Sequence, residues 1–286
     1  STDWRDALFS QNGVTQSHNL NISGGLSNDN IAIRNNLSMG YFQEKGNIVH
    51  TNYDRVTLRD NAGIDLGHFG IDLGLALTYT NQKAPTSAAV GDLYAITSAI
   101  NRQRPVDLIK DENGDWVITA TNDTRNPVRQ AEEGGLDQKK IYNVIANIKL
   151  HYDITKELVI NFTKSANYLS TDRDQFKNTL EWSNGTTTGP NSSTKESYST
   201  IHYMQQLDLN FDRHYGDHHI KAIIGGQQEY EKYKYLSAYR RDFVNNSSGS
   251  LQLGSSDGQN NSSVDWDWGL VGAFARINYD YKSKYL

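Results

Sequence analysis

The chain contains no cysteine among its 286 residues and only four prolines. The lack of cysteine excludes a disulfide scaffold, thiol catalysis and sulfur-ligated metals. No stretch approaches the roughly 18 consecutive apolar residues that a membrane-spanning helix requires. Any part of this chain that crosses a membrane must therefore belong to a β-barrel, because only helices and closed barrels satisfy their backbone groups in lipid.

The sequence also lacks a strong excess of either positive or negative charge. The net charge is −5, and acidic and basic residues are interspersed along the chain, so no basic stripe is available for phosphate backbones and we expect no nucleic-acid partner. The first residues, STDWRDALFSQNG, lack the positive start and apolar core of a secretion signal. On this basis we expect either a cytoplasmic chain or an interior piece of a larger protein.

Alternation of apolar and polar residues is the dominant pattern. In residues 269–286, GLVGAFARINYDYKSKYL, apolar and polar or small residues alternate one by one, which puts each set on one face of a β-strand. Eight further stretches share the pattern. The nine predicted strands cover residues 17–24, 30–42, 53–66, 69–79, 140–152, 158–168, 198–211, 220–228 and 269–281.

The connections between these strands alternate in length. Short turns join the members of each hairpin, whereas residues 80–138, 169–197 and 229–265 form long connections rich in Asn, Ser, Gly and Thr. The first long connection is predicted to contain a short helix at residues 91–103. This asymmetry is typical of an up-and-down transmembrane β-barrel, with tight turns on one side and long loops on the other.

Tyrosine is abundant, with 17 residues. Several lie near the ends of predicted strands, where a barrel carries aromatic girdles at the two lipid boundaries. The alternative is that tyrosine is simply a good strand former. The girdle prediction covers Tyr41, Tyr53, Tyr79, Tyr142, Tyr152, Tyr168, Tyr198, Tyr279 and Tyr281.

Nine is an odd number of strands, and bacterial single-chain barrels have even numbers. We therefore expect an all-β antiparallel sheet that forms an open arc of a larger barrel, with both edges unpaired.

Seven stretches, spread over the whole chain, resemble a known family. They are TDWRDALF (2–9), TQSHNLNISGG (15–25), MGYFQEKGNIVHTNYDRVTLR (39–59), RPVDLIKDENGDW (104–116) with NPV (126–128), HYDITKELVINF (151–162), HHIKAIIGGQQEYEKYKYLSA (218–238) and WGLVGAFARINYDYKSKYL (268–286). In this order they resemble SusC/RagA-like TonB-dependent outer-membrane transporters, which act with a SusD-like surface lipoprotein.

The resemblance implies that residues 1–286 form part of one barrel domain of about 22 strands. It implies an outer-membrane location in a Gram-negative bacterium, contact with membrane lipid, and uptake of oligosaccharides or peptides. TonB would act through an N-terminal plug region, which is absent from this sequence together with the closing strands.

Two alternatives to a transporter wall remain open. One is a soluble all-β glycan-binding or adhesin-like domain, and the other is a secreted β-rich carbohydrate-active enzyme. The first would pack its apolar strand faces on each other, and neither explains a long connection after every second strand. No phosphate loop, His-Glu-x-x-His or nucleophile elbow is present, so we expect no enzyme and no cofactor.

Two charged residues interrupt the apolar sets. Asp60 shares a face with Val56 and Leu58, and Lys164 raises the same question in the sixth strand. A charge in the middle of a lipid-facing surface is unfavourable. A bulge or register shift near Asp60 would relieve it.

Four tryptophans are candidates for ligand contact. Trp266 and Trp268 share a strand face and could stack on sugars, although anchoring at the membrane interface is the favoured interpretation. Trp116 and Trp182 lie in long connections, where ligand contact and loop packing are equally good interpretations.

Two groups of residues could bind a metal, but for both an ordinary turn without a metal is the favoured interpretation. Asp111, Asn113 and Asp115 have calcium-loop spacing but lack the required Gly and Glu, so an Asn-Gly turn is expected. His214, His218 and His219 surround one turn, but no carboxylate is placed with them at a defined spacing. We therefore expect solvated histidines and no metal site.

Overall fold

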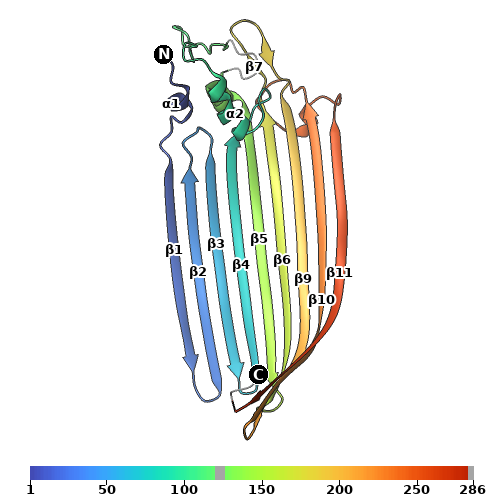
Figure 1. Cartoon of the computed structure of the whole chain (residues 1–286). Helices are drawn as coiled ribbons and strands as arrows, with labels where there is room; N and C mark the ends of the chain where they lie inside the picture. The colour runs from blue at the N-terminus through green and yellow to red at the C-terminus, as the bar shows by residue number, and fades with distance from the viewer. Residues whose placement is uncertain (120–125, 283–286) are drawn as a thin grey trace.

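The computed structural model describes residues 1–119 and 126–282. Nine strands form one antiparallel sheet in the order β1-β2-β3-β4-β5-β6-β9-β10-β11 (Figure 1). Their bounds are β1 Val14–Ser27, β2 Ile31–Lys45, β3 Asn52–Leu66, β4 Phe69–Pro85, β5 Gly135–Asp153, β6 Leu158–Lys177, β9 Ser192–Tyr215, β10 His218–Arg241 and β11 Asn260–Tyr281. The nine predicted strands and their order are confirmed.

The strands are longer than predicted. β9 and β10 each have 24 residues and extend well beyond the alternating apolar stretches. The outer part of β9 is polar on both faces, and that of β10 mixes polar and aromatic residues on both faces, so neither shows the alternation that predicts a strand. The backbone ladder nevertheless continues there, with Arg241 still paired to Ser192.

The sheet has a turn end and a loop end. At the turn end, residues 28–30, 67–68, 154–157 and 216–217 connect the hairpins. At the loop end, residues 46–51 form a short connection, whereas 86–134, 178–191 and 242–259 are long. Figure 1 shows the helices and the small hairpin of β7 (Leu180–Glu181) and β8 (Thr187–Thr188) gathered above the strands at this end.

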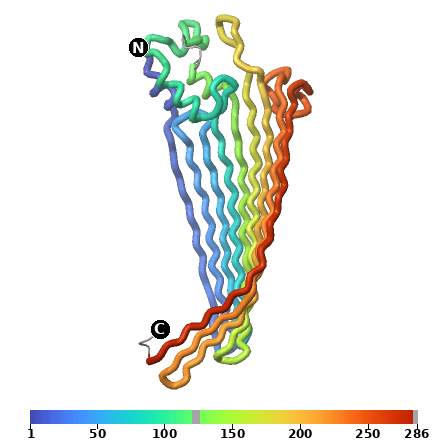
Figure 2. The backbone as a smooth tube through the Cα atoms, turned by 45° about the vertical axis from the view of Figure 1, so that its right-hand side comes forward, coloured from blue at the N-terminus to red at the C-terminus, as the bar shows by residue number. Residues whose placement is uncertain are grey.

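The sheet is curved and open. Figure 2 shows the turn ends of β10 and β11 sweeping across toward the other edge of the sheet. Within the described residues, β1 and β11 each have only one neighbouring strand, so both outer edges are unpaired. This is the open arc that the odd number of strands predicts.

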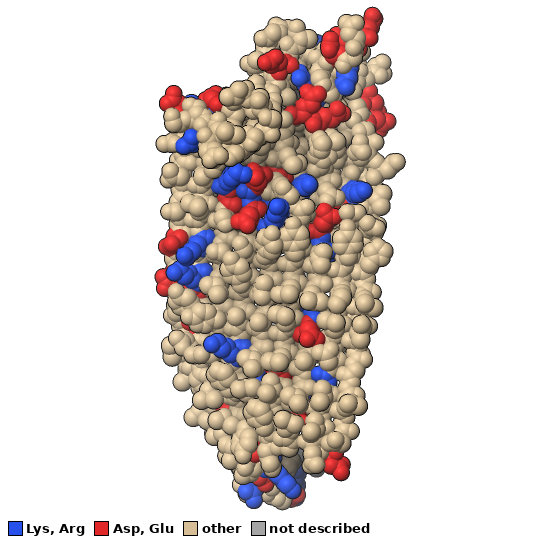
Figure 3. Space-filling view, turned by 180° about the vertical axis from the view of Figure 1, so that it is seen from behind, with Lys and Arg blue, Asp and Glu red and all other residues tan. Residues whose placement is uncertain are grey.

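One face of the sheet is apolar and uncovered. Leu20, Ile22, Leu73 and Ile224 lie on it, and each is between 48% and 62% exposed. Figure 3 shows the molecule from behind, where charged side chains gather toward the loop end and are sparse over the middle and lower part. No second sheet covers these side chains in the described part of the chain. The dry interior between two layers that a sandwich requires is therefore missing.

Aromatic side chains form two rows on this apolar face. Tyr79 pairs with Tyr142 toward the loop end, and Phe69 pairs with Tyr152 toward the turn end. The two rows are ten residues apart along β4 and along β5.

Two tyrosines of the girdle prediction do not belong to these rows. Tyr53 pairs with Glu44 and Gln82, and Tyr198 pairs with Tyr235 and Thr171, all on the polar face. Both tyrosines stand one residue out of phase with the apolar set, which is why the girdle prediction is wrong for them.

Asp60 and Lys164, the two charged residues that interrupt the apolar face, cause no irregularity in the backbone pairing between strands. Asp60 pairs with Leu37 on one side and Leu75 on the other, in continuous register. Its carboxylate accepts a hydrogen bond of 2.8 Å from the side-chain amide of Asn35. Lys164 is likewise in register between Ile148 and Gln205. The suggested bulge near Asp60 is absent, because a neighbouring amide satisfies the carboxylate instead.

The buried apolar cluster lies in the loops. The predicted helix at residues 91–103 is present as α2 (Leu93–Ala99) followed by the 3-10 turn η1 (Ile100–Arg102). Two short helices that were not predicted join it, α1 (Trp4–Leu8) and α3 (Pro127–Glu133). A second 3-10 turn, η2 (Leu251–Leu253), lies in the last long connection. The described helices are all too short and too polar to span a bilayer. The cluster consists of Trp4, Leu8, Ile48, Ile96, Val128 and Ala131.

The junction between α3 and β5 depends on Gly135. Its φ is +131°, and a Cβ there would lie 2.1 Å from the carbonyl oxygen of Phe176 in β6. Only glycine adopts this conformation without strain of about 1–3 kcal/mol, and here the backbone contact adds to that cost. We expect Gly135→Ala to speed protease cleavage of the connection at residues 86–134 by about tenfold or more.

Gly114→Ala is the matched control, because Gly114 also has a positive φ, of +86°, but has open space around its Cβ position. Limited proteolysis followed by mass spectrometry compares the two variants. Equal cleavage rates would contradict the structural role assigned to Gly135.

Candidate ligand-binding wall

A set of aromatic rings lies on the polar face of β9, β10 and β11. Because alternate residues of a strand share a face, Trp266 and Trp268 are neighbours on one side of β11, and the cross-strand register places aromatic residues of β10 and β9 on the same face. We call this set the aromatic ladder. It consists of Tyr198, His202, Tyr233, Tyr235, Trp266 and Trp268.

The rings pair across the strands. The ring centroids of Trp266 and Tyr233 are 5.2 Å apart, and those of Tyr198 and Tyr235 are 5.5 Å apart, both stacked. His202 and Trp268 are tilted at 6.1 Å. Such separations lie in the favourable range for aromatic pairs.

Carboxylates border the ladder. The indole Nε1 of Trp268 donates to Glu231 over 3.3 Å, and Nε2 of His202 lies 3.7 Å from a carboxylate oxygen of Glu229. The hydroxyl of Tyr235 donates to Glu196 over 3.0 Å. The ladder therefore combines ring faces with hydrogen-bond acceptors.

Arg173 fixes the end of the ladder nearest the loops. Its guanidinium donates to Asp137 over 2.9 Å through Nε and to Glu196 over 2.9 Å through Nη1, so it links β5, β6 and β9. Burial alone would raise the pKa of Glu196, but hydrogen bonds from Arg173 and Tyr235 hold it below its usual value. These three acidic and basic side chains are at most 25% exposed.

Chemically, the ladder suits ligands with flat faces and hydrogen-bond donors. Trp266 is 43% exposed and Trp268 is 39% exposed, so parts of both rings remain available. Aromatic faces stack on sugar rings or on apolar side chains, and the bordering carboxylates can accept hydrogen bonds from hydroxyl or amide groups.

The structure separates the four candidate tryptophans. Trp266 and Trp268 come together in the ladder, on the polar face of the sheet and away from the apolar side chains. Trp182 is only 4% exposed, and its Nε1 donates to Thr188 over 2.7 Å, which supports loop packing. Nε1 of Trp116 donates to Glu133 over 2.8 Å.

The calcium-like motif is a turn. The carboxylate of Asp111 accepts backbone hydrogen bonds of 2.9 Å from Asn113 and Asp115, and Gly114 has a φ of +86°. This confirms the Asn-Gly turn.

Sequence reasoning missed four members of the ladder: Tyr198, His202, Tyr233 and Tyr235. Their identity as one set follows only from the cross-strand register, which brings residues more than 30 positions apart into contact. A usable signal does exist, since Tyr233 and Tyr235 have the same i, i+2 spacing as Trp266 and Trp268.

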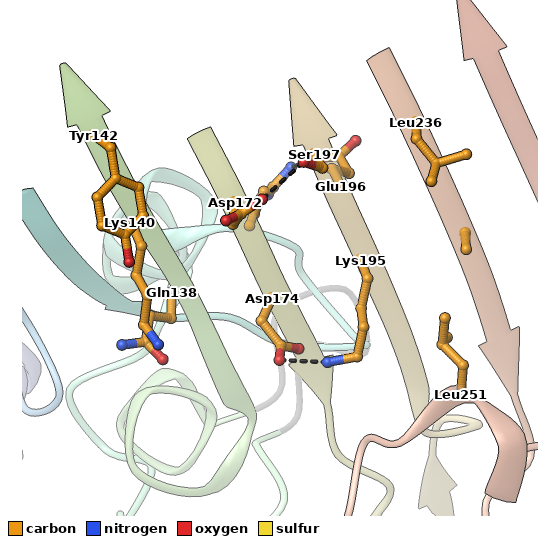
Figure 4. A pocket seen from close by; sticks show the side chains of 12 residues that line it. Gln138, Lys140, Tyr142, Asp172, Asp174, Lys195, Glu196, Ser197, Leu236 and Leu251 are labelled. Carbon is orange, nitrogen blue, oxygen red and sulfur yellow. Dashed lines mark hydrogen bonds and ion pairs between the residues drawn. The ribbon is translucent and has the colours of Figure 1, made fainter. Parts of the chain in front are cut away.

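A groove lies on the opposite, apolar face of the sheet, and Tyr142 is one of the residues that line it. This outer groove has a volume of about 480 Å³ and is bordered by β5, β6, β9 and β10 (Figure 4). Its polar side chains already pair with each other, with Ser197 donating to Asp172 over 2.8 Å and Lys195 bonded to Asp174. The ladder is the better candidate for ligand contact, because it lies on the polar face and leaves parts of the Trp266 and Trp268 rings exposed.

Removing the cation of the half-buried network should loosen the loop ends of β6 and β9. Arg173→Met would leave Asp137 and Glu196 without their charged partner, and hydrogen bonds to charged groups contribute about 1.5–3 kcal/mol each before allowance for solvent. We expect backbone amides of residues 172–177 and 192–197 to exchange hydrogen at least about fivefold faster.

Lys195→Met is the matched control, because the side chains of Lys195 and Asp174 are 40% and 55% exposed and such pairs contribute about 0–1 kcal/mol. The effect of Arg173 should depend on pH. Because the pKa of Glu196 is lowered in the fold, this contribution is present above its usual value of 4.5 and is lost as pH falls through the lowered value. Equal exchange in both variants at neutral pH would exclude this role.

Comparisons with known proteins agree with the fold. No family model matches the chain. Two curated relatives from Formosa agariphila match almost its whole length: TonB-dependent receptor P3, 26% identical over 100% of the chain, and TonB-dependent receptor P39, 26% identical over 99%. The chain spans 28% and 26% of their lengths.

Solved structures show the same architecture. The RagAB peptide importer in its closed-closed state superposes with a TM-score of 0.76 at 14% identity, over 98% of this chain and 31% of that one. A second RagAB structure gives 0.74 at 13% identity, over 98% and 32%. At this identity the likeness establishes the fold. Along its full length the chain is therefore similar in sequence to TonB-dependent receptors, and it has the fold of a segment of the barrel wall of the RagAB importer.

Proposed function

We propose that this chain forms part of the wall of an outer-membrane importer. In this arrangement the apolar face contacts acyl chains, the polar face lines the lumen, and the loop end faces the cell exterior. The uncovered apolar face carries the proposal, because a soluble protein rarely leaves so much contiguous apolar surface in water.

The width of the apolar band supports this orientation. The aromatic rows on β4 and β5 are ten residues apart, from Tyr79 to Phe69 and from Tyr142 to Tyr152. At a rise of about 3.3 Å per residue and a tilt of about 40°, ten residues cover about 25 Å, which is the height of the apolar band of outer-membrane barrels.

The complete protein would supply what this segment lacks. We propose that residues 1–286 belong to one barrel domain of about 22 strands, which pairs both open edges. A plug region would contact TonB and receive the energy for uptake. A SusD-like surface lipoprotein would dock at the loop end.

Oligosaccharides are the ligand class that the ladder favours, because exposed Trp faces with bordering carboxylates suit sugar rings. Peptides are the alternative, supported by the fold that the chain shares with the RagAB peptide importer. A soluble binding domain or a secreted enzyme is not favoured, since neither would leave Leu73 and Ile224 facing water.

The membrane assignment predicts that an arginine introduced on the apolar face destabilises the receptor, whereas one introduced at the same depth on the polar face does not. Leu73→Arg puts a charge in the middle of the apolar face, where it costs about 2–4 kcal/mol in a bilayer. Asn147→Arg adds the same side chain to the polar face, one residue away from Ile148, the partner of Leu73. We expect only Leu73→Arg to reduce the folded fraction of the complete receptor.

The measurement is urea unfolding of the receptor in lipid vesicles, followed by the gel-mobility shift of folded barrels. If both variants unfold at the same urea concentration, the apolar face does not contact lipid, and the proposal fails.

The ligand assignment predicts that the ladder contributes to affinity. Trp266→Ala combined with Trp268→Ala removes two stacking surfaces, each worth about 0.5–1.5 kcal/mol, so binding should weaken by about tenfold. Tyr94→Ala is the control, because Tyr94 is 79% exposed on α2, outside the ladder.

Isothermal titration of the complete receptor against panels of oligosaccharides and of peptides provides the measurement. Weakened binding of peptides alone would favour the peptide alternative. Unchanged affinity for every ligand that the unmodified receptor binds would remove the ladder from the binding site.

A further inference from the structure

Three polar side chains meet at the turn end of the hairpin formed by β9 and β10. We propose that Asp212, His214 and His219, here called the rim cluster, bind a divalent transition-metal ion such as Zn²⁺. This inference does not depend on the transported ligand.

The turn creates the juxtaposition. Gly216, with a φ of +62°, opens a two-residue turn that pairs Tyr215 with His218 and therefore His214 with His219. Asp212 lies two residues before His214 and so shares its face. One ligand atom from each of the three residues lies within 4.8 Å of the other two.

The side chains already contact one another. The rings of His214 and His219 stack with centroids 3.6 Å apart and an interplanar angle of 16°. Nε2 of His219 lies 2.6 Å from Oδ1 of Asp212. A metal ion with bonds of about 2.0–2.2 Å needs ligand atoms closer together than 4.8 Å. Rotation of side chains can achieve this, because Asp212 and His214 are exposed.

Charges of both signs surround the rim cluster, and Lys221 and Arg276 line the same hollow as Asp212. Asp280 lies opposite His219 in the register of β10 and β11, which adds a second carboxylate to this region. Nζ of Lys221 lies 3.2 Å from Oδ2 of Asp212 and is the competing cation. Lys221 uses the oxygen that does not contact His219, so one carboxylate oxygen is directed at the imidazoles.

The donor set selects the kind of metal. Two imidazoles and one carboxylate suit Zn²⁺ and other first-row transition metals, whereas Ca²⁺ and Mg²⁺ prefer oxygen ligands alone. Three protein ligands leave one tetrahedral position for water. From the sequence alone, no carboxylate could be placed with these histidines. Asp212 is that carboxylate, and it is recognisable only once the strand shows that Asp212 and His214 lie on the same face.

His218 provides an internal control. It belongs to the same turn, but it lies on the opposite face, with Nδ1 2.6 Å from the hydroxyl of Tyr279. Removing its imidazole therefore changes the histidine content of the turn without changing the rim cluster.

The experiment titrates the complete protein in detergent with Co²⁺, whose absorption reports imidazole and carboxylate ligation, and then displaces Co²⁺ with Zn²⁺. We expect saturable binding of one ion, weakened at least about tenfold by His214→Ala and by Asp212→Asn and unchanged by His218→Ala. Mg²⁺ should not compete.

The gel-mobility shift of folded barrels checks that each variant folds, and His214→Gln replaces His214→Ala if the latter does not. Absence of saturable binding to the unmodified protein would overturn the proposal. Equal weakening by His218→Ala would also overturn it, because it would mean that any histidine near the turn captures the ion.

Discussion

The cross-strand register is the constraint on which the rest of this structure depends. In a strand the side chains alternate between faces, so a slip of one residue in any hairpin would move its apolar set to the polar face and its charges to the apolar face. Each tight turn fixes one such register. The two-residue turn at Gly216, for example, determines the pairing of all 24 residue pairs between β9 and β10, from the histidines at one end to Tyr235 and Tyr198 near the other.

The sequence GIDLG, which occurs at residues 63–67 and again at 70–74, illustrates how closely the sequence follows this register. The two copies flank one turn, so Gly63 pairs with Asp72 and Asp65 pairs with Gly70. Arg34 lies across this hairpin and forms ion pairs with both aspartates. A Cβ at Gly63 would lie 2.5 Å from Nε of Arg34, so the glycine makes room for the guanidinium against the sheet. Both aspartates of the repeat and one of its glycines therefore serve a single polar contact.

The faces and the order of the strands could be predicted because both follow from local alternation and from hairpin connectivity. The strand ends could not, since residues such as those from 229 to 241 mix polar and aromatic residues on both faces and lose the alternation of the apolar band. Trp266 and Trp268 were recognisable as a pair from their spacing alone. Their partners, Tyr233 and His202, required the register, because no local pattern relates residues on three different strands.

Polar groups within the apolar band follow a consistent rule of mutual satisfaction. Asn35 donates to Asp60 over 2.8 Å, and Gln205 donates to Gln228 over 2.8 Å, in each case between adjacent strands. An unsatisfied polar group in a nonpolar medium costs several kcal/mol, whereas a cross-strand pair exchanges that cost for one hydrogen bond.

Lys164 differs from these pairs, because its long aliphatic stem can carry the ammonium along the surface toward water. A sheet that faced water on both sides would not need such pairs on its apolar face. The pairing of Asn35 with Asp60 and of Gln205 with Gln228 is therefore compatible with the proposed lipid-facing surface, because each pair satisfies its polar groups without water.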